Sequence, residues 1–179
     1  HSTPAPLPIC IQEVTSRRDL RAFVKFPWQV YKGDPNWVPP LISERLDYLN
    51  PKKNPFYQQA EVALFLARQG RQVVGTIAPF VNHRAVEHLG EKVGGFGFFE
   101  VIEDYAVAER LLDTARDWVK ARGMAILRGP YNFGSSDTPG VLVAGADCPP
   151  VVLEAHTPPY YKTFLERYGM VKYQDGYAW

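Results

Sequence analysis

Two groups of residues have the chemistry of a reactive site. Glu100 ends an apolar, glycine-rich run at 94–101, where a carboxylate is suited to take a proton from an amine nucleophile. The alternative is a solvent-facing strand end or a cap for the next helix. The glycines of this run also have two interpretations: a close approach of ligand to backbone, or a bulge that relieves crowding by the neighbouring phenylalanines.

The second group lies in a long stretch, 129–150, that is rich in Gly, Ser, Asp and Pro. Its polar members are Asn132, Ser135, Ser136 and Asp137. Loops of this length in compact domains are usually functional, and loops on a rigid scaffold often carry binding residues. We therefore expect these side chains to bind the amine or headgroup of a substrate, with simple turn chemistry as the alternative.

The histidines give a weaker signal. His83 and His88 share a segment with Glu87, but the spacing matches no strong metal pattern, so we expect a solvated loop and no metal. His156 precedes the last helix and is either a proton carrier near neutral pH or a partly buried histidine bonded to backbone.

Hydrophobic periodicity predicts the elements that position these residues. Helices are expected at 16–27, 42–49, 104–122 and 158–168, the last one stopped by Gly169. Strands are expected at 9–14, 61–68, 71–81, 94–101, 124–127 and 151–155, with a last one that ends at Trp179. The order predicts an α/β (α+β) fold with a mixed, mostly antiparallel sheet and helices on both faces.

Composition limits the class of protein. With 179 residues the chain fits one domain, and a net charge of +1 gives no argument for nucleic acid or a polybasic membrane patch. No apolar run approaches the about 18 residues that a transmembrane helix needs. Cys10 and Cys148 are expected to be free thiols in the cytoplasm. The proline-rich residues 1–8 are expected to form a flexible arm before a single domain at 9–179.

Several uncommon motifs occur together. They are Asp-Pro-Asn-Trp-Val-Pro-Pro-Leu at 34–41, Asn-Pro-Phe at 54–56, Gly-Gly-Phe-Gly-Phe-Phe-Glu at 94–100, Gly-Pro-Tyr-Asn at 129–132, Pro-Pro at 149–150 and Pro-Pro-Tyr-Tyr at 158–161. In this order they resemble the bacterial ceramide-synthase-like acyltransferases of the GNAT superfamily, over nearly all of residues 9–179.

The resemblance implies an acyl-CoA-dependent transfer of an acyl group to an amine or amino-alcohol acceptor. In that fold the cofactor lies where two central strands splay apart, which would bring pantetheine against Gly97, Phe98 and Phe99. The base would be Glu100 or Asp137, and the acid for the departing thiolate Tyr161. The resembled proteins typically continue into a second GNAT-like module, so we expect this chain to be the N-terminal module of a longer protein.

Two departures from the GNAT pattern stand against autonomous catalysis. The segment 100–108, where a glycine-rich phosphate loop would lie, has no glycine and carries Glu103 and Asp104. The usual position of the acid, four residues before Gly169, is Leu165, and Tyr161 lies one turn earlier on roughly the same face. The alternative to an enzyme is a non-catalytic module that shapes a substrate cleft or pairs with a second, CoA-binding module.

Overall fold

The computed structural model describes residues 7–130, 158–173 and 176–178. Its helices are α1 (Arg17–Val30), α2 (Ile42–Tyr48), the short 3₁₀ helix η1 (Pro55–Gln58), α3 (His83–Leu89), α4 (Tyr105–Lys120) and α6 (Pro159–Tyr168). Its strands are β1 (Ile9–Glu13), β2 (Ala60–Val62), β3 (Phe65–Gln69), β4 (Gln72–Asn82), β5 (Val93–Val101), β6 (Ile126–Gly129), β7 (Val171–Tyr173) and β8 (Gly176–Ala178).

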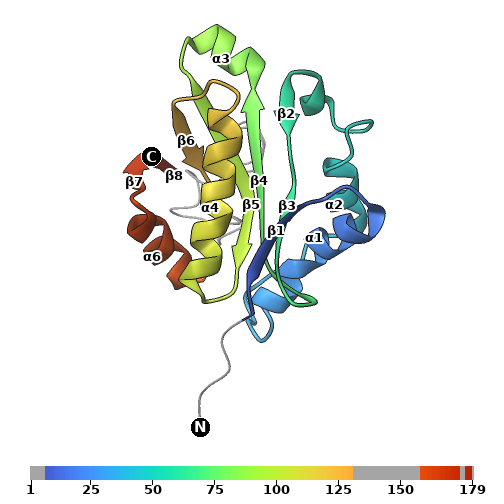
Figure 1. Ribbon diagram of the computed structural model, residues 1–179. Helices are drawn as coiled ribbons and strands as arrows, with labels where there is room; N and C mark the ends of the chain where they lie inside the picture. Colours follow the sequence, from blue (N-terminus) through green and yellow to red (C-terminus); the bar gives the residue numbers. More distant parts are fainter. Residues whose placement is uncertain (1–6, 131–157, 174–175, 179) are drawn as a thin grey trace.

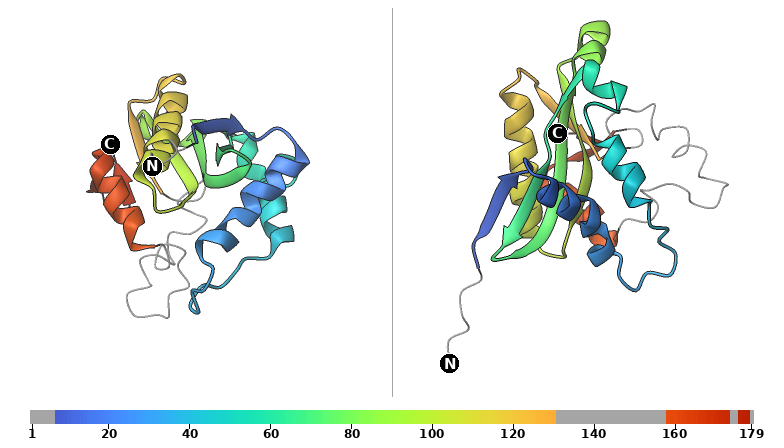
Figure 2. Two further views of the ribbon diagram at one scale, coloured as in Figure 1. Left: turned by 60° about the horizontal axis from the view of Figure 1, so that its bottom comes forward. Right: turned by 90° about the vertical axis from the view of Figure 1, so that its right-hand side faces the viewer.

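Within these residues the strands form one eight-stranded sheet in the order β1-β3-β4-β5-β6-β8-β7, with β2 also paired to β4 (Figure 1). All pairs are antiparallel except β5 and β6, which run parallel. Helix α4 covers one face, and α1 and α2 cover the other (Figure 2). The predicted fold class, a mixed and mostly antiparallel sheet with helices on both faces, is confirmed.

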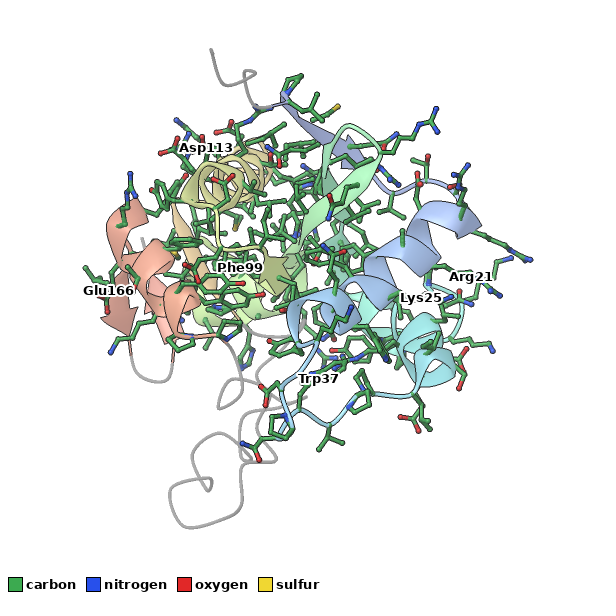
Figure 3. All side chains as sticks on the ribbon, turned by 90° about the horizontal axis from the view of Figure 1, so that it is seen from below. Arg21, Lys25, Trp37, Phe99, Asp113 and Glu166 are labelled. Carbon is green, nitrogen blue, oxygen red and sulfur yellow. The ribbon has the colours of Figure 1, made fainter. Side chains whose placement is uncertain are left out.

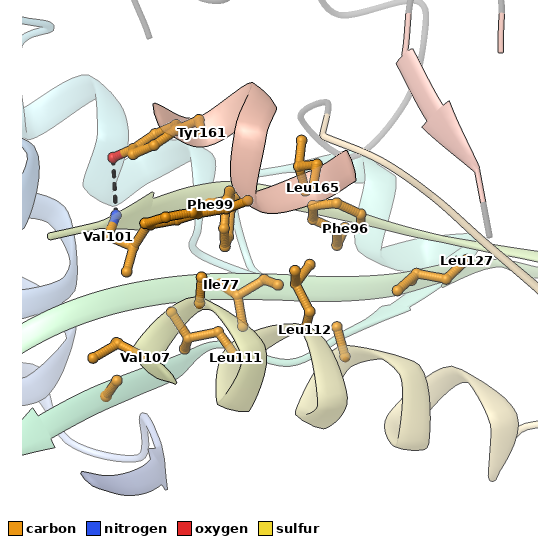
Figure 4. Packing of buried hydrophobic residues seen from close by; sticks show 14 of the residues in the cluster. Ile77, Phe96, Phe99, Val101, Val107, Leu111, Leu112, Leu127, Tyr161 and Leu165 are labelled. Carbon is orange, nitrogen blue, oxygen red and sulfur yellow. Dashed lines mark hydrogen bonds between the residues drawn. The ribbon is translucent and has the colours of Figure 1, made fainter. Parts of the chain in front are cut away.

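The main core lies between the sheet and α4. The helix begins where the Asp104 side chain accepts a hydrogen bond from the Ala106 N–H, and its apolar stripe is buried against the strands. The buried residues of the stripe are Val107, Ala108, Leu111, Leu112, Ala115 and Val119. Figure 4 shows this stripe below β4 and β5, with α6 side chains packed on the other side of Phe96 and Phe99. Each fully buried Leu or Phe contributes about 1.5–3 kcal/mol, so burial of this stripe holds α4 against the sheet.

Three local predictions were wrong. Helix α1 continues through Pro27 to Val30, because Phe23 and Phe26 are buried and the Pro27 carbonyl still accepts the Tyr31 N–H. The predicted strand 61–68 is divided into β2 and β3 opposite Pro79, whose nitrogen has no hydrogen to donate to the ladder. The predicted loop at His83 is helix α3, which begins at an Asn82 side-chain cap.

Some predictions lie outside the described residues. They are the strand at 151–155, almost all of the stretch 129–150, and the arm at 1–8 apart from its last two residues. The expected single domain at 9–179 stays a prediction. No described helix has both the length and the apolar character that crossing a bilayer requires.

Candidate active site

A β-bulge shapes the end of β5. Thr76 of β4 pairs with Glu100 and Ala78 pairs with Gly97, so Phe98 and Phe99 together lie opposite one residue. Phe98 has φ 50°, a left-handed conformation that costs a non-glycine residue about 1–2 kcal/mol. The Thr76 hydroxyl donates to the Phe98 carbonyl at 2.7 Å and holds the bulge. A bulge was one of the two interpretations that the sequence left open for this run, and the structure has one; bulges are common beside functional sites.

Strands β5 and β6 separate after Gly95, before the chain reaches the bulge. Their pairing runs from Val93–Ile126 to Gly95–Arg128, whereas β5 continues to Val101. Gly129 ends β6 so close to Phe96 that a Cβ there would lie 2.6 Å from the Phe96 carbonyl oxygen. The last part of β5 therefore presents its edge to α6 instead of to β6.

The two tyrosines at the start of α6 occupy that edge. The Val101 N–H donates to the Tyr161 hydroxyl at 2.9 Å (Figure 4). The Tyr160 hydroxyl donates to the Val101 carbonyl at 2.7 Å. Because Ile102 bonds to Val74 of β4, the alternation of an antiparallel ladder turns both polar groups of Val101 outward. Tyrosine side chains of α6 thus form the hydrogen bonds at this edge of β5 that another strand or a ligand would otherwise form.

Glu100 lies where α1, β5 and α6 meet. Its Oε2 accepts a hydrogen bond of 2.6 Å from the Tyr161 hydroxyl, and its Oε1 accepts a long one of 3.5 Å from Tyr31 at the end of α1. The Tyr31 ring stacks on Trp37, with centroids 5.0 Å apart and an interplanar angle of 8°. Figure 3 shows α1 and α6 on opposite sides of this end of the sheet, with Phe99 between them and Trp37 on the segment after α1. Oε1, with only the long contact, is the oxygen better placed for an additional donor.

Burial dominates the electrostatics of the site. It raises the pKa of Glu100 from 4.5 to about 7, against the opposing effects of the hydrogen bonds from Tyr161 and Tyr31 and of the charge of Arg45. Burial, followed by the charge of Glu100, raises the pKa of Tyr161 and of Tyr31 well above the ordinary value of 10.0. Burial and the same charge raise the pKa of Tyr160 to about 12. The hydroxyls therefore stay protonated, and the carboxyl changes its charge near neutral pH.

The structure brings two of the predicted catalytic residues together. Glu100 and Tyr161 are in direct hydrogen-bond contact, although 61 positions separate them in the chain. The predicted cofactor-binding residues Gly97, Phe98 and Phe99 lie at the bulge: Gly97 is buried opposite Ala78, the Phe98 carbonyl bonds to Thr76, and the Phe99 ring packs on Tyr161. The predicted base Asp137 and the predicted substrate residues Asn132, Ser135 and Ser136 lie outside the described residues, as does His156.

Sequence reasoning missed Tyr31, Tyr160 and Arg45. No spacing links them to Glu100, since Tyr31 is 69 positions away and only the fold brings its hydroxyl to the carboxylate. The nearest signal was the run Pro-Pro-Tyr-Tyr, which marked Tyr160 and Tyr161 as unusual neighbours.

The histidine segment has a structural role. The ring of His83 is 2.8 Å from Glu61 Oε1, and Arg122 donates to Oε2 of the same carboxylate at 2.9 Å, which links β2, α3 and the end of α4. These two bonds lower the pKa of Glu61. In the described part of the chain, no three His, Cys, Asp or Glu side chains group as metal ligands would.

The junction between β5 and α4 does not fit the diphosphate of CoA. Anion sites at helix N-termini need free backbone N–H groups and a positive surrounding potential. Here the Asp104 carboxylate accepts from the Ala106 N–H at 3.0 Å, Glu103 adds a second negative charge, and the Val101 N–H bonds to Tyr161. The residues at this junction satisfy one another and repel an anion.

Similarity to known sequences covers nearly the whole chain. No family model matches. The chain is 39% identical over 167 residues to a bacterial ceramide synthase of Caulobacter vibrioides, a match that spans 93% of this chain and 44% of that protein. It is 32% identical over 169 residues to Protein YghO of Escherichia coli, over 94% of this chain and 43% of that protein. The chain therefore spans less than half the length of these curated relatives.

Solved structures show the same fold. A tandem GNAT protein from the clavulanic acid pathway superposes with a TM-score of 0.62 at 11% identity, over 93% of this chain and 45% of that one. The PaiA N-acetyltransferase of Thermoplasma acidophilum, in complex with coenzyme A, gives 0.55 at 12% identity over 96% and 97%. An N-acetyltransferase of Staphylococcus aureus gives 0.57 at 12% identity over 96% and 98%.

The class that the structure defines is one of fold: the chain has the fold of GNAT acetyltransferases. Its sequence is similar to that of a bacterial ceramide synthase and to that of Protein YghO.

Proposed function

We propose that this chain is a module of an N-acyltransferase and that Glu100 is the base for the amine acceptor. The observation that carries the proposal is the partly buried Glu100 carboxyl, whose pKa of about 7 matches proton transfer at neutral pH. The GNAT fold and the similarity to a ceramide synthase support acyl transfer as the reaction class.

An amine attacks a carbonyl carbon only through its neutral form, whereas simple alkyl ammonium groups have pKa values of about 10. A substrate ammonium at Oε1 would first give one proton to Glu100. The resulting neutral amine would then attack the acyl carbon, the C–S bond of the thioester would break, and the departing thiolate would take up a proton. Burial favours the first proton transfer, because it favours the neutral carboxylic acid that results. Tyr161 at Oε2 keeps the carboxylate oriented before the proton arrives.

Tyr161 is better suited to position Glu100 than to protonate a leaving group directly. Its hydroxyl proton points to Glu100, and its own acceptor site is taken by the Val101 N–H. Its pKa is raised above the ordinary value, which makes it a weaker acid than free tyrosine. The earlier prediction that Tyr161 protonates the thiolate stays a prediction.

The acyl donor is expected to be held elsewhere in a longer protein. The junction of β5 and α4 does not suit a diphosphate, and the chain matches less than half of each curated relative. We propose that this chain is the N-terminal module and that a second GNAT-like module binds acetyl-CoA or a longer acyl-CoA. The resemblance to a tandem GNAT protein supports this pairing.

A second candidate is a non-catalytic module that shapes the substrate cleft or pairs with a CoA-binding module. The junction between β5 and α4, where residues of this chain already bond to the backbone N–H groups, favours the non-catalytic module. The two candidates differ in what they require of Glu100, since only the first needs its carboxyl to exchange a proton.

Two measurements test the proposal. Titration calorimetry of this chain with acetyl-CoA and a long-chain acyl-CoA is expected to show no binding, and low-micromolar binding would contradict the separation of donor and base. In the complete protein, Glu100→Gln is expected to lower the transfer rate by about 10²–10⁴ and to remove the limb of the pH–rate profile near pH 7. An unchanged rate would refute the role of Glu100 as the base and would favour the second candidate, the non-catalytic module.

A further inference from the structure

Arg45 forms an unusual group with the bulge on the α1–α2 face of the sheet. Its Cζ lies 5.2 Å from the centroid of the Phe98 ring, a cation–π distance. The bulge turns that ring to this face, where Phe23 and Tyr48 pack on it at centroid distances of 5.9 Å. The strained backbone of Phe98 therefore provides a fixed aromatic support for the guanidinium.

The guanidinium of Arg45 is partly buried and has no carboxylate partner among the described residues. It donates no hydrogen bond to any residue in the described part of the chain, and no carboxylate there forms an ion pair with it. Glu100 and Glu44 act on it only through space, and burial lowers its pKa. A guanidinium has five N–H donors in a planar fork, and those of Arg45 are not among the buried unsatisfied atoms of the described residues, so they remain available to solvent or to a ligand.

The surroundings of Arg45 favour one kind of anion. The planar fork matches a carboxylate through two parallel hydrogen bonds. Leu41, one turn before Arg45 at the start of α2, is 62% exposed, and the Phe98 and Tyr48 rings are partly exposed. Apolar surface beside a guanidinium suits an aliphatic chain attached to the carboxylate better than a bare, strongly hydrated phosphate.

We propose that Arg45 and the Phe98 ring form a binding site for an aliphatic carboxylate, next to Glu100. The carboxylate would bond to the guanidinium fork while its chain covers Leu41 and the aromatic rings. Two sources share this chemistry: a fatty carboxylate alone, or an acceptor that carries both an amine and a carboxylate. The site does not depend on Glu100 being a base, so it can stand if the proposed function fails.

Glu100 is the titratable group next to this site, with Glu44 and Tyr48 as its other charged or ionisable neighbours. A bound carboxylate would repel an ionised Glu100, so binding and proton uptake by Glu100 are expected to support each other. Affinity for the carboxylate should thus be higher at pH 6 than at pH 8, which a contact with a distant surface cation would not produce.

The test uses octanoate, octanol and 2-aminooctanoate as probes, titrated into this chain and followed by backbone amide NMR shifts. We expect octanoate to bind at least about tenfold more tightly than octanol, since hydrogen bonds to a charged group are the strong ones. Arg45→Gln is expected to remove this difference and Arg45→Lys to restore part of it. The matched control is Arg110→Gln, an exposed arginine on α4, which should keep the difference.

Equal binding of octanoate and octanol, no binding of octanoate, or an unchanged preference in Arg45→Gln would each overturn the proposal. Tighter binding of 2-aminooctanoate than of octanoate would assign the carboxylate to an amine acceptor, and equal binding would assign it to a fatty carboxylate. Arg45→Gln removes a partly buried charge that has no ion-pair partner in the described part of the chain, so the thermal unfolding temperature should change little, and a folded variant keeps the comparison valid.

Discussion

Replacing Glu100 with Gln should make the stability of the protein less dependent on pH, and the size of the change follows from the buried carboxyl. In the folded state its pKa is about 7, against 4.5 for the free group. Between these values the native state binds the proton and the unfolded state does not, so the free energy of unfolding falls as pH rises. This loss, about 2.5 kcal/mol between pH 5 and pH 8, is absent in a neutral amide. The amide oxygen can still accept from Tyr161.

The assay is urea unfolding followed by tryptophan fluorescence, at several values between pH 5 and pH 8. We expect Glu100→Gln to be similar to the wild type at pH 5 and more stable by about 2.5 kcal/mol at pH 8, a shift of about 1 M urea in midpoint. Glu166→Gln, on the outer side of α6, controls for the loss of a surface carboxylate (Figure 3). A difference between Glu100→Gln and the wild type that stays constant from pH 5 to pH 8 would refute the reasoning.

Substitutions at three further positions test the surrounding structure. Tyr161→Phe leaves the buried Val101 N–H without its 2.9 Å partner and should lower the free energy of unfolding in urea by about 1–3 kcal/mol. The same substitution removes a hydrogen bond that lowers the pKa of Glu100, so the pKa of Glu100 should rise in an NMR titration. Gly95→Ala would place a Cβ 2.4 Å from the Phe80 ring and should lower stability by about 1–3 kcal/mol. Asp104→Ala removes the N-cap of α4 and should cost about 1 kcal/mol, whereas Asp104→Asn should cost little.

Much of the architecture could be predicted from local patterns. The spacing of apolar residues in α4 and the acidic cap at Asp104 are signals within one segment, and they predicted the helix closely. The errors arose where distant contacts decide. Burial of Phe23 and Phe26 carries α1 past Pro27, and the missing N–H of Pro79 divides a strand elsewhere in the chain.

The candidate site was predictable only in part. Glu100 was a candidate because it ends an apolar, glycine-rich run, where a carboxylate is suited to take a proton from an amine; in the structure, burial is the main cause of its raised pKa. Its contacts with Tyr31 and Tyr161 depend on how α1 and α6 meet at the end of β5, which no spacing in the sequence encodes. The support of Arg45 by the Phe98 ring also requires the bulge in its folded geometry.

The most direct test of the central claim is the titration of Glu100 itself. Carbon-13 NMR of the glutamate side-chain carboxyl resonances, with Glu100→Gln to assign the signal, measures its pKa in the folded protein. We predict a midpoint of about 7, raised mainly by burial and opposed by the hydrogen bonds from Tyr161 and Tyr31. A midpoint near the ordinary value of 4.5 would contradict this prediction, because Glu100 would then be too weak a base for the proposed proton transfer.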